Sequence, residues 1–148
     1  MKLSFIGGGI MAGAIIGGAL SKGLVGRDDI FVGEPREEQR QSLEERFGVS
    51  TTTSNSTAAE RGDIVLLSIK PQDLPGVLKE LNGSLRQDQA ILSIVAGAGM
   101  SSIMDALGHP SVMRAMPNTP AQIGEGISLW TSSPQTDGEK RSLAQSIL

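Results

Sequence analysis

The chain has 148 residues, which fits a single domain with one core, so we expect one domain over residues 1–148. Hydrophobic residues make up 39% and charged residues 20%, as in globular proteins, and the net charge of -3 offers no positive field to a nucleic-acid backbone. The chain has no cysteine and one histidine, which excludes disulfides and thiolate sites and argues against a metal centre.

The first expected elements are a short apolar strand over residues 2–6, a glycine-rich turn and a helix that ends near Gly23. Apolar residues recur in this helix at helical spacing, and they are Ile10, Ala14, Ile15 and Ala19. A second strand is expected over residues 30–32 and a second helix over residues 37–47, with Gly48 placed to cap that helix.

Strands and helices continue to alternate along the chain. We expect strands over residues 49–51, 64–69, 90–95 and 112–116, and helices over residues 54–61, 72–81 and 101–107. The unbroken apolar run over residues 64–69 is typical of a strand covered on both faces. This pattern predicts an α/β fold with a doubly wound, mostly parallel sheet of the Rossmann type and helices on both faces.

The alternation stops after Met116. A loop rich in proline and glycine is expected up to residue 126, followed by a strand over residues 127–131 that would form an antiparallel edge near the C-terminus. Residues 136–139 resemble a capping box that opens a last helix. That helix is still running at Leu148, so we expect the chain to be part of a longer protein.

Residues 7–12 read Gly-Gly-Gly-Ile-Met-Ala and satisfy the G-x-G-x-x-G/A fingerprint between an expected strand and an expected helix. We expect Gly7 to make the tight turn, Gly9 to let the backbone approach a pyrophosphate, and Ala12 to permit close packing of helix and sheet. The first amides of the helix, which would face the phosphates, belong to Ile10 and Met11. The alternative is a glycine turn that binds no ligand.

Glu34 and Arg36 follow the second strand, somewhat beyond the roughly 20-residue offset at which an acidic side chain meets the adenosine ribose. A carboxylate at that position favours NAD, because it would repel a 2′-phosphate. Arg36 could pair with such a phosphate instead. The two residues therefore leave NADP and NAD open as cofactors, and an ordinary charged loop is the alternative for both.

Three further segments follow expected strands at the sheet edge where a ligand would lie. The first is Ile69-Lys70-Pro71, in which residue type alone favours solvent for the lysine. The second ends with Ala96 and Gly97, whose small size would let a flat ring approach the backbone. The third, Arg114 to Pro120, places a polar Asn-Thr pair between two prolines, which suits hydrogen bonding to a ligand, although a structural turn is the alternative.

Taken together and in order, these motifs resemble pyrroline-5-carboxylate reductase over essentially the whole chain. The resemblance implies that the glycine turn binds the cofactor pyrophosphate, that Lys70 and Pro71 lie along the cofactor, and that Ala96 and Gly97 lie near the nicotinamide. It also implies that the cavity where nicotinamide and substrate meet is bordered by Met116, Pro117, Asn118 and Thr119. Asn118 would then contact both cofactor and substrate.

The resemblance implies hydride transfer from NADPH or NADH to the imine of 1-pyrroline-5-carboxylate, which gives L-proline. That reaction requires positioning more than a strong acid or base, so the lack of an obvious catalytic residue is no objection, and we expect His109 to lie in a turn. The family's helical dimerisation domain has no counterpart here, so we expect this chain to be the cofactor-binding part of a homo-oligomeric enzyme. Ile10 and Glu34 depart from residues common in the family, which leaves the cofactor preference open.

Two other functions remain as alternatives: a stand-alone NAD(P)-binding module without catalysis, and a related reductase such as a deazaflavin-dependent NADP reductase or a β-hydroxyacid dehydrogenase. The segment from Arg114 to Pro120 argues against both. The sequence contains no run of about 18 apolar residues and no apolar signal-peptide core after Met1. We therefore expect a cytoplasmic protein without a membrane or nucleic-acid partner.

Overall fold

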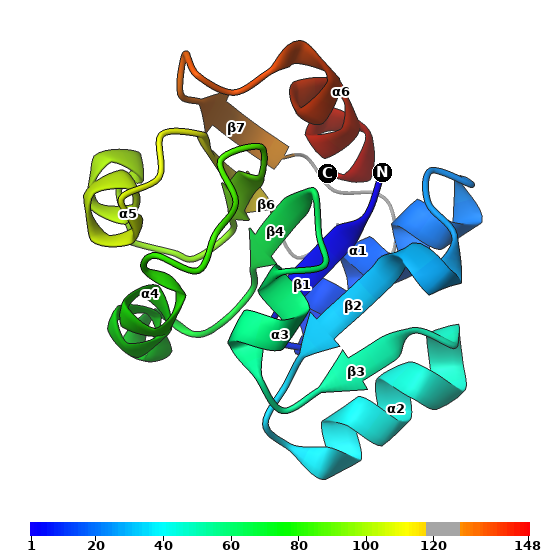
Figure 1. The fold of residues 1–148 in the computed structure, drawn as a ribbon. Helices are drawn as coiled ribbons and strands as arrows, with labels where there is room; N and C mark the ends of the chain where they lie inside the picture. The colour runs from blue at the N-terminus through cyan, green and yellow to red at the C-terminus, as the bar shows by residue number, and fades with distance from the viewer. Residues whose placement is uncertain (118–127) are drawn as a thin grey trace.

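The computed structural model describes residues 1–117 and 128–148. Its centre is a seven-stranded sheet with the order β3-β2-β1-β4-β5-β6-β7 (Figure 1). The first six strands are parallel, and the last runs antiparallel to β6 at one edge. The strands are β1 (Leu3–Ile6), β2 (Ile30–Gly33), β3 (Ser50–Thr52), β4 (Ile64–Leu67), β5 (Ala90–Ser93), β6 (Val112–Pro117) and β7 (Ser128–Ser132). The predicted Rossmann-type fold and its antiparallel edge strand are confirmed.

Helices cover both faces of this sheet, as predicted. One face packs against α1 (Ile10–Ser21), α2 (Glu37–Phe47) and α6 (Gly138–Ile147), and the other against α3 (Asn55–Ala59), α4 (Leu74–Leu81) and α5 (Met100–Leu107). Two short 3₁₀ helices, η1 (Arg27–Asp29) and η2 (Pro71–Asp73), precede β2 and α4. No helix in the described ranges is long and apolar enough to cross a membrane.

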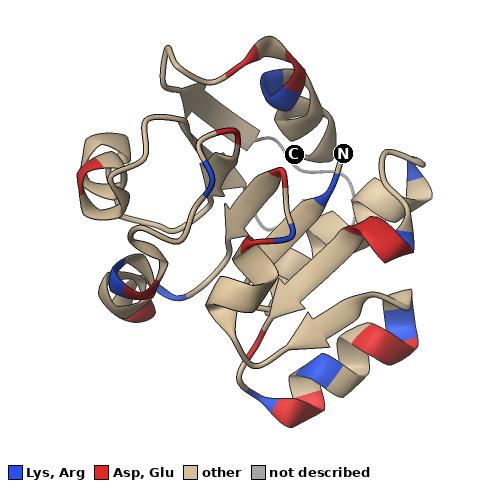
Figure 2. Ribbon diagram, viewed as in Figure 1, with Lys and Arg blue, Asp and Glu red and all other residues tan. Residues whose placement is uncertain are grey.

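Alternate side chains of the central strands enter two separate cores. In β1, Leu3 and Phe5 pack with α1, and in β4, Val65 and Leu67 pack with the opposite helices. All four side chains are fully buried, which accounts for the unbroken apolar runs in the sequence. Charged residues lie mainly on loops and outer helices and alternate in sign along α2 (Figure 2).

The strand order reverses between β1 and β4, and this reversal determines where a ligand can enter. From β1 the chain winds outward to β3, then crosses back to place β4 on the other side of β1. The loops that leave β1 and β4 therefore diverge to opposite faces of the sheet. Such a crevice at the carboxyl ends of the strands is where open α/β sheets bind ligands.

Two local predictions were wrong. Ile10 was placed in the apolar stripe of the first helix, but its side chain is 74% exposed, because the buried face of α1 runs through Ala12, Ile16 and Ala19 instead. The last helix is not capped by Thr136: the side chain of Asp137 accepts the capping hydrogen bond from the Lys140 amide. Thr136 is buried, and its hydroxyl pairs with those of Ser111 and Ser133.

Other element boundaries shifted by a few residues. The strands predicted to end at residues 69 and 95 end at Leu67 and Ser93, and the helix predicted from residue 72 begins as η2 before α4. The helix predicted over residues 54–61 covers Asn55–Ala59. The loop predicted before β7 lies mostly outside the described residues.

Candidate functional site

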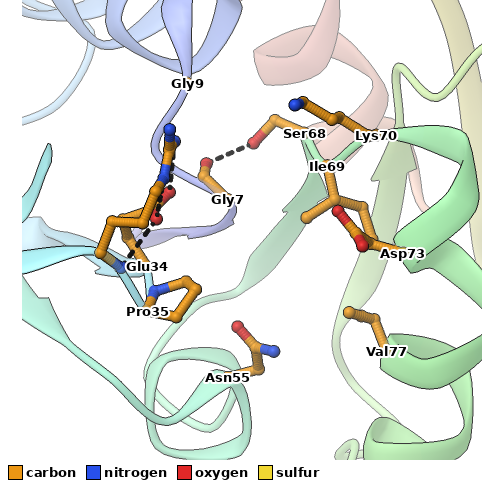
Figure 3. Close-up of a pocket in the computed structure, with 11 residues that line it drawn as sticks. Gly7, Gly9, Glu34, Pro35, Asn55, Ser68, Ile69, Lys70, Asp73 and Val77 are labelled. Atoms are coloured by element: carbon orange, nitrogen blue, oxygen red, sulfur yellow. Dashed lines mark hydrogen bonds and ion pairs between the residues drawn. The ribbon is translucent and has the colours of Figure 1, made fainter.

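A cavity of about 360 Å³ opens in the crevice between the loops that leave β1 and β4 (Figure 3). Its walls come from the glycine turn after β1, the segment after β2, the start of α3, and the segment from the end of β4 into α4. The lining residues are Gly7, Gly9, Glu34, Pro35, Arg36, Asn55, Ser68, Ile69, Lys70, Asp73 and Val77. Six of these, namely Gly7, Gly9, Glu34, Arg36, Ile69 and Lys70, were predicted from the sequence as cofactor-binding residues.

Gly7 forms the tight turn at the end of β1. Its φ of +96° lies in the region that favours glycine, and a Cβ atom there would lie 2.7 Å from the carbonyl oxygen of Ser68. The Gly7 amide donates to the carbonyl of Gly33 at 2.8 Å, and the Ser68 hydroxyl donates to the Gly7 carbonyl at 2.7 Å. The turn is thus held from β2 on one side and from the end of β4 on the other.

Gly9 is the N-cap residue of α1 and faces open space. Its φ and ψ of -72° and -167° are accessible to any residue, and a Cβ atom built there meets no other part of residues 1–117 and 128–148 within 4 Å. No side chain caps the helix, and its first turn carries no acidic residue. Amides at the start of a helix have no partners within the helix, so this end of α1 offers hydrogen-bond donors and a positive dipole to an anion.

The carboxylate of Glu34 is turned inward toward the glycine turn. Its side chain is only 4% exposed and accepts hydrogen bonds from the Gly8 amide at 2.9 Å and the Arg36 amide at 3.0 Å. The Arg36 guanidinium donates a third through Nε at 2.9 Å (Figure 3). Burial raises the pKa of the Glu34 carboxyl, but the hydrogen bonds from the Arg36 side chain and from the two amides outweigh burial and hold the pKa below its ordinary value.

We expect Glu34→Gln to make the protein less stable near neutral pH but not in acid. Because the pKa of Glu34 is lowered by folding, its contribution to stability is present above the ordinary value of about 4.3 and is lost as pH falls through the lower folded value. The expected loss at about pH 7 is roughly 1–2 kcal/mol, since a hydrogen bond to a charged group is replaced while an acceptor oxygen remains. Urea unfolding at about pH 7 and about pH 3 measures the difference.

Glu45→Gln is the matched control, because Glu45 is exposed on α2 and its side chain makes no hydrogen bond within the part of the chain that the structure describes. It should change the free energy of unfolding by no more than about 0.5 kcal/mol. A cost of Glu34→Gln that is the same at both pH values would contradict the role assigned to the carboxylate.

Two cationic side chains lie at the same cavity. The Arg36 side chain is 65% exposed although its guanidinium is bound to Glu34, and Lys70 is exposed at the opposite wall, next to Ser68 (Figure 3). The pairing with Glu34 raises the pKa of Arg36. The cavity therefore combines helix amides and two positive charges, a donor set suited to a phosphorylated ligand.

The sequence did not identify five of the lining residues. Ser68 follows β4 directly, and Asn55 begins α3 with its side-chain amide donating to a Glu80 carboxylate oxygen at 3.0 Å. The one sequence feature that could have identified them is their position, because both residues lie at or just after the ends of predicted strands, at the carboxyl edge of the sheet. The other three are Pro35, Asp73 and Val77.

Besides Ile10, which is exposed at the start of α1 and does not line this cavity, five other predicted cofactor-binding residues lie close to the cavity or farther along the same sheet edge. Ala12 is fully buried under the turn, Met11 is partly buried, and Pro71 opens η2 beside Lys70. Ala96 and Gly97 are exposed after β5, where Gly97 has a φ of +76°. These five do not line the cavity described above, as far as the described residues define it.

The predicted substrate-proximal residues lie at the end of β6 or beyond it. Met116 is 55% exposed and pairs with Leu129 of β7, and Pro117 is the last residue of the strand. Asn118 and Thr119 lie outside the described residues, so their predicted contacts stay predictions. Parallel strands have their carboxyl ends at the same edge of the sheet, so Met116 and Ala96 lie at the edge that also carries the glycine turn.

Residues 2–97 match the model of the family described as "NADP oxidoreductase coenzyme F420-dependent". The chain is 37% identical over 128 residues to pyrroline-5-carboxylate reductase of Escherichia coli K12, a match that covers 86% of this chain and 48% of the relative. It is 32% identical to the Synechocystis reductase, over 99% of this chain and 55% of that relative. The chain thus spans about half the length of these relatives.

Solved structures show the same similarity. Pyrroline-5-carboxylate reductase from Coxiella burnetii superposes with a TM-score of 0.93 at 31% identity, over 99% of this chain and 54% of that chain. Plasmodium falciparum pyrroline carboxylate reductase, solved with NADP bound, superposes with a TM-score of 0.85 over 99% of this chain and 53% of that chain. Its identity is 23%, so this second likeness concerns the fold alone.

Proposed function

This chain belongs to the family described as "NADP oxidoreductase coenzyme F420-dependent", and from that premise we propose that it is the cofactor-binding part of a pyrroline-5-carboxylate reductase. The observation that carries the proposal is the open face of Gly9 at the start of α1, within a cavity at the reversal of strand order. This cradle accepts the pyrophosphate of a dinucleotide. The reductase relatives, matched over 86% and 99% of this chain, supply the substrate class.

In the proposed reaction, reduced nicotinamide supplies a hydride to the imine carbon of 1-pyrroline-5-carboxylate. The electron pair of the C=N bond moves to the nitrogen, which is already protonated, and the product is the secondary amine L-proline. No strong acid or base is needed, because the protonated imine is electrophilic. The chain therefore contributes by binding and orienting the dinucleotide.

We assign the cofactor contacts by position along the sheet edge. Gly9 and the amides of Ile10 and Met11 take the pyrophosphate, and the turn that contains Glu34 and Arg36 takes the adenosine ribose. The β4 segment Ile69-Lys70-Pro71 lies along the dinucleotide. The nicotinamide and substrate end is assigned to Ala96, Gly97, Met116, Pro117, Asn118 and Thr119. The complete protein is proposed to be a cytoplasmic homo-oligomer.

Titration of the chain with NADPH and NADH tests cofactor binding directly. We expect saturable enhancement of reduced-nicotinamide fluorescence with at least one of the two dinucleotides, because binding shields the nicotinamide from water. If neither dinucleotide changes the fluorescence, the proposed function is refuted. With the complete protein, 1-pyrroline-5-carboxylate should cause loss of the reduced-nicotinamide absorbance and formation of proline.

The family description favours a second candidate, in which a reduced deazaflavin is the hydride donor to NADP. The family match ends at residue 97, whereas the Synechocystis reductase match covers 99% of the chain, which includes β6 and β7. The reductase is therefore the better-supported candidate. Oxidation of reduced coenzyme F420 by NADP with the complete protein, without turnover of 1-pyrroline-5-carboxylate, would reverse this choice.

A further inference from the structure

We propose that Asp73 recognises the adenine base of the cofactor by accepting a hydrogen bond from its exocyclic 6-amino group. This inference rests on the proposed function, because it requires that the cavity hold the adenosine half of a dinucleotide. It adds a residue that determines which base the site accepts.

The carboxylate of Asp73 is available to a ligand. Asp73 ends η2 and directly precedes α4, yet its side chain does not cap that helix. Asp73 is exposed and lines the cavity, and its carboxylate has no hydrogen-bond or ion-pair partner within residues 1–117 and 128–148. The other carboxylate of the cavity, Glu34, is already occupied by the amides and the guanidinium described above.

The surroundings of Asp73 suit a flat ring. In Figure 3, Asp73 lies between Ile69 and Val77 on one wall, and Pro35 lies on the opposite wall. Val77 is buried and Ile69 is partly buried, so the wall beside the carboxylate is apolar. Asn55 closes the lower end of the same space in this view. An apolar slot with a few polar groups at its edge is the usual form of a site that orients a heterocycle.

The charge of the carboxylate excludes the phosphates, and its position sets it apart from the ribose. A phosphate would be repelled by Asp73, and the phosphate cradle lies at Gly9, on the far side of Gly7 in Figure 3. The acidic residue at the ribose position after β2 is Glu34, not Asp73. Adenine presents an NH₂ group at position 6, whereas hypoxanthine presents a carbonyl oxygen there, which a carboxylate would repel.

The test compares NADH with reduced nicotinamide hypoxanthine dinucleotide, in which a carbonyl oxygen replaces the 6-amino group and N1 of the base carries a proton. We expect the unmodified chain to bind NADH about tenfold more tightly, the effect of one hydrogen bond to a charged group. Asp73→Ala should remove this preference by weakening NADH binding and by relieving the repulsion of the hypoxanthine analogue. Fluorescence titration measures both dissociation constants, and thermal unfolding checks that the variant is folded.

Asp105→Ala, which removes an exposed carboxylate on α5 away from the cavity, is the matched control and should retain the full preference. Equal binding of the two dinucleotides by the unmodified chain would overturn the inference while the proposed function stands. An Asp73→Ala variant that weakens both dinucleotides by the same factor would also overturn it, because Asp73 would then act only on the structure of the loop. Absence of binding by either dinucleotide would refute the proposed function itself.

Discussion

Replacing Gly9 by alanine is expected to leave the fold intact and to weaken binding of both NADPH and NADH by about 100-fold, which corresponds to about 2.7 kcal/mol. The backbone angles of Gly9 are accessible to alanine, and within the described residues the new methyl group would meet no atom closer than 4 Å outside its own stretch of chain. It would instead occupy the space through which a pyrophosphate approaches the backbone. Fluorescence titration measures the loss, and a thermal unfolding curve should stay within a few degrees of the unmodified protein.

Alanine variants of two other glycines distinguish a loss of ligand binding from a loss of stability. Gly18→Ala adds a methyl group to the same helix, also without a neighbour within 4 Å, and should leave cofactor binding unchanged. Gly7→Ala should destabilise the protein by roughly 1–3 kcal/mol, because the left-handed backbone and the 2.7 Å approach to Ser68 are both incompatible with a side chain. Gly9→Ala that binds NADPH and NADH normally would show that no pyrophosphate lies against this turn.

The fold could be predicted because its local and global signals agree. Buried parallel strands produce unbroken apolar runs, and the runs at β4 and β5 are separated by amphipathic helices and glycine breaks. The resemblance to pyrroline-5-carboxylate reductase, read from motifs in sequence order, is confirmed by the relatives. The predicted strand over residues 64–69 was two residues too long. The Ser68 hydroxyl donates to the Gly7 carbonyl, and Ile69 lines the cavity wall instead of continuing the sheet.

The site could be predicted only where a sequence motif has a known physical reason for binding a ligand. The glycine turn carries such a mechanism, and the structure gives Gly7 and Gly9 the backbone angles and free space that it requires. Asn55 and Asp73 carry no local signal, since only the packing of α3 and α4 brings them to one cavity. The orientation of Glu34 was also beyond a sequence pattern: its carboxylate faces the Gly8 amide, a contact between residues 26 positions apart.

We expect Glu34→Gln to shift the cofactor preference toward NADPH by about tenfold relative to NADH. In the unmodified protein the Arg36 guanidinium is held by Glu34, and the buried negative charge lies where a 2′-phosphate would approach. Glutamine removes that charge and frees the guanidinium to bind the phosphate through charge-assisted hydrogen bonds. The ratio of the dissociation constants for NADPH and NADH, measured by titration of both variants, reports the shift.

The ion pair predicts coupling between the two residues, which a double-mutant cycle isolates. Arg36→Gln should weaken NADPH binding more in the Glu34→Gln background than in the unmodified protein, because only in that background is the guanidinium free for the 2′-phosphate. NADH lacks that phosphate, so its binding should change little with Arg36→Gln in the Glu34→Gln background. If Arg36→Gln changes the affinity for NADPH equally in both backgrounds, the pairing of Arg36 with Glu34 does not control the cofactor preference. Any shift in preference would then come from the repulsion between Glu34 and the 2′-phosphate alone.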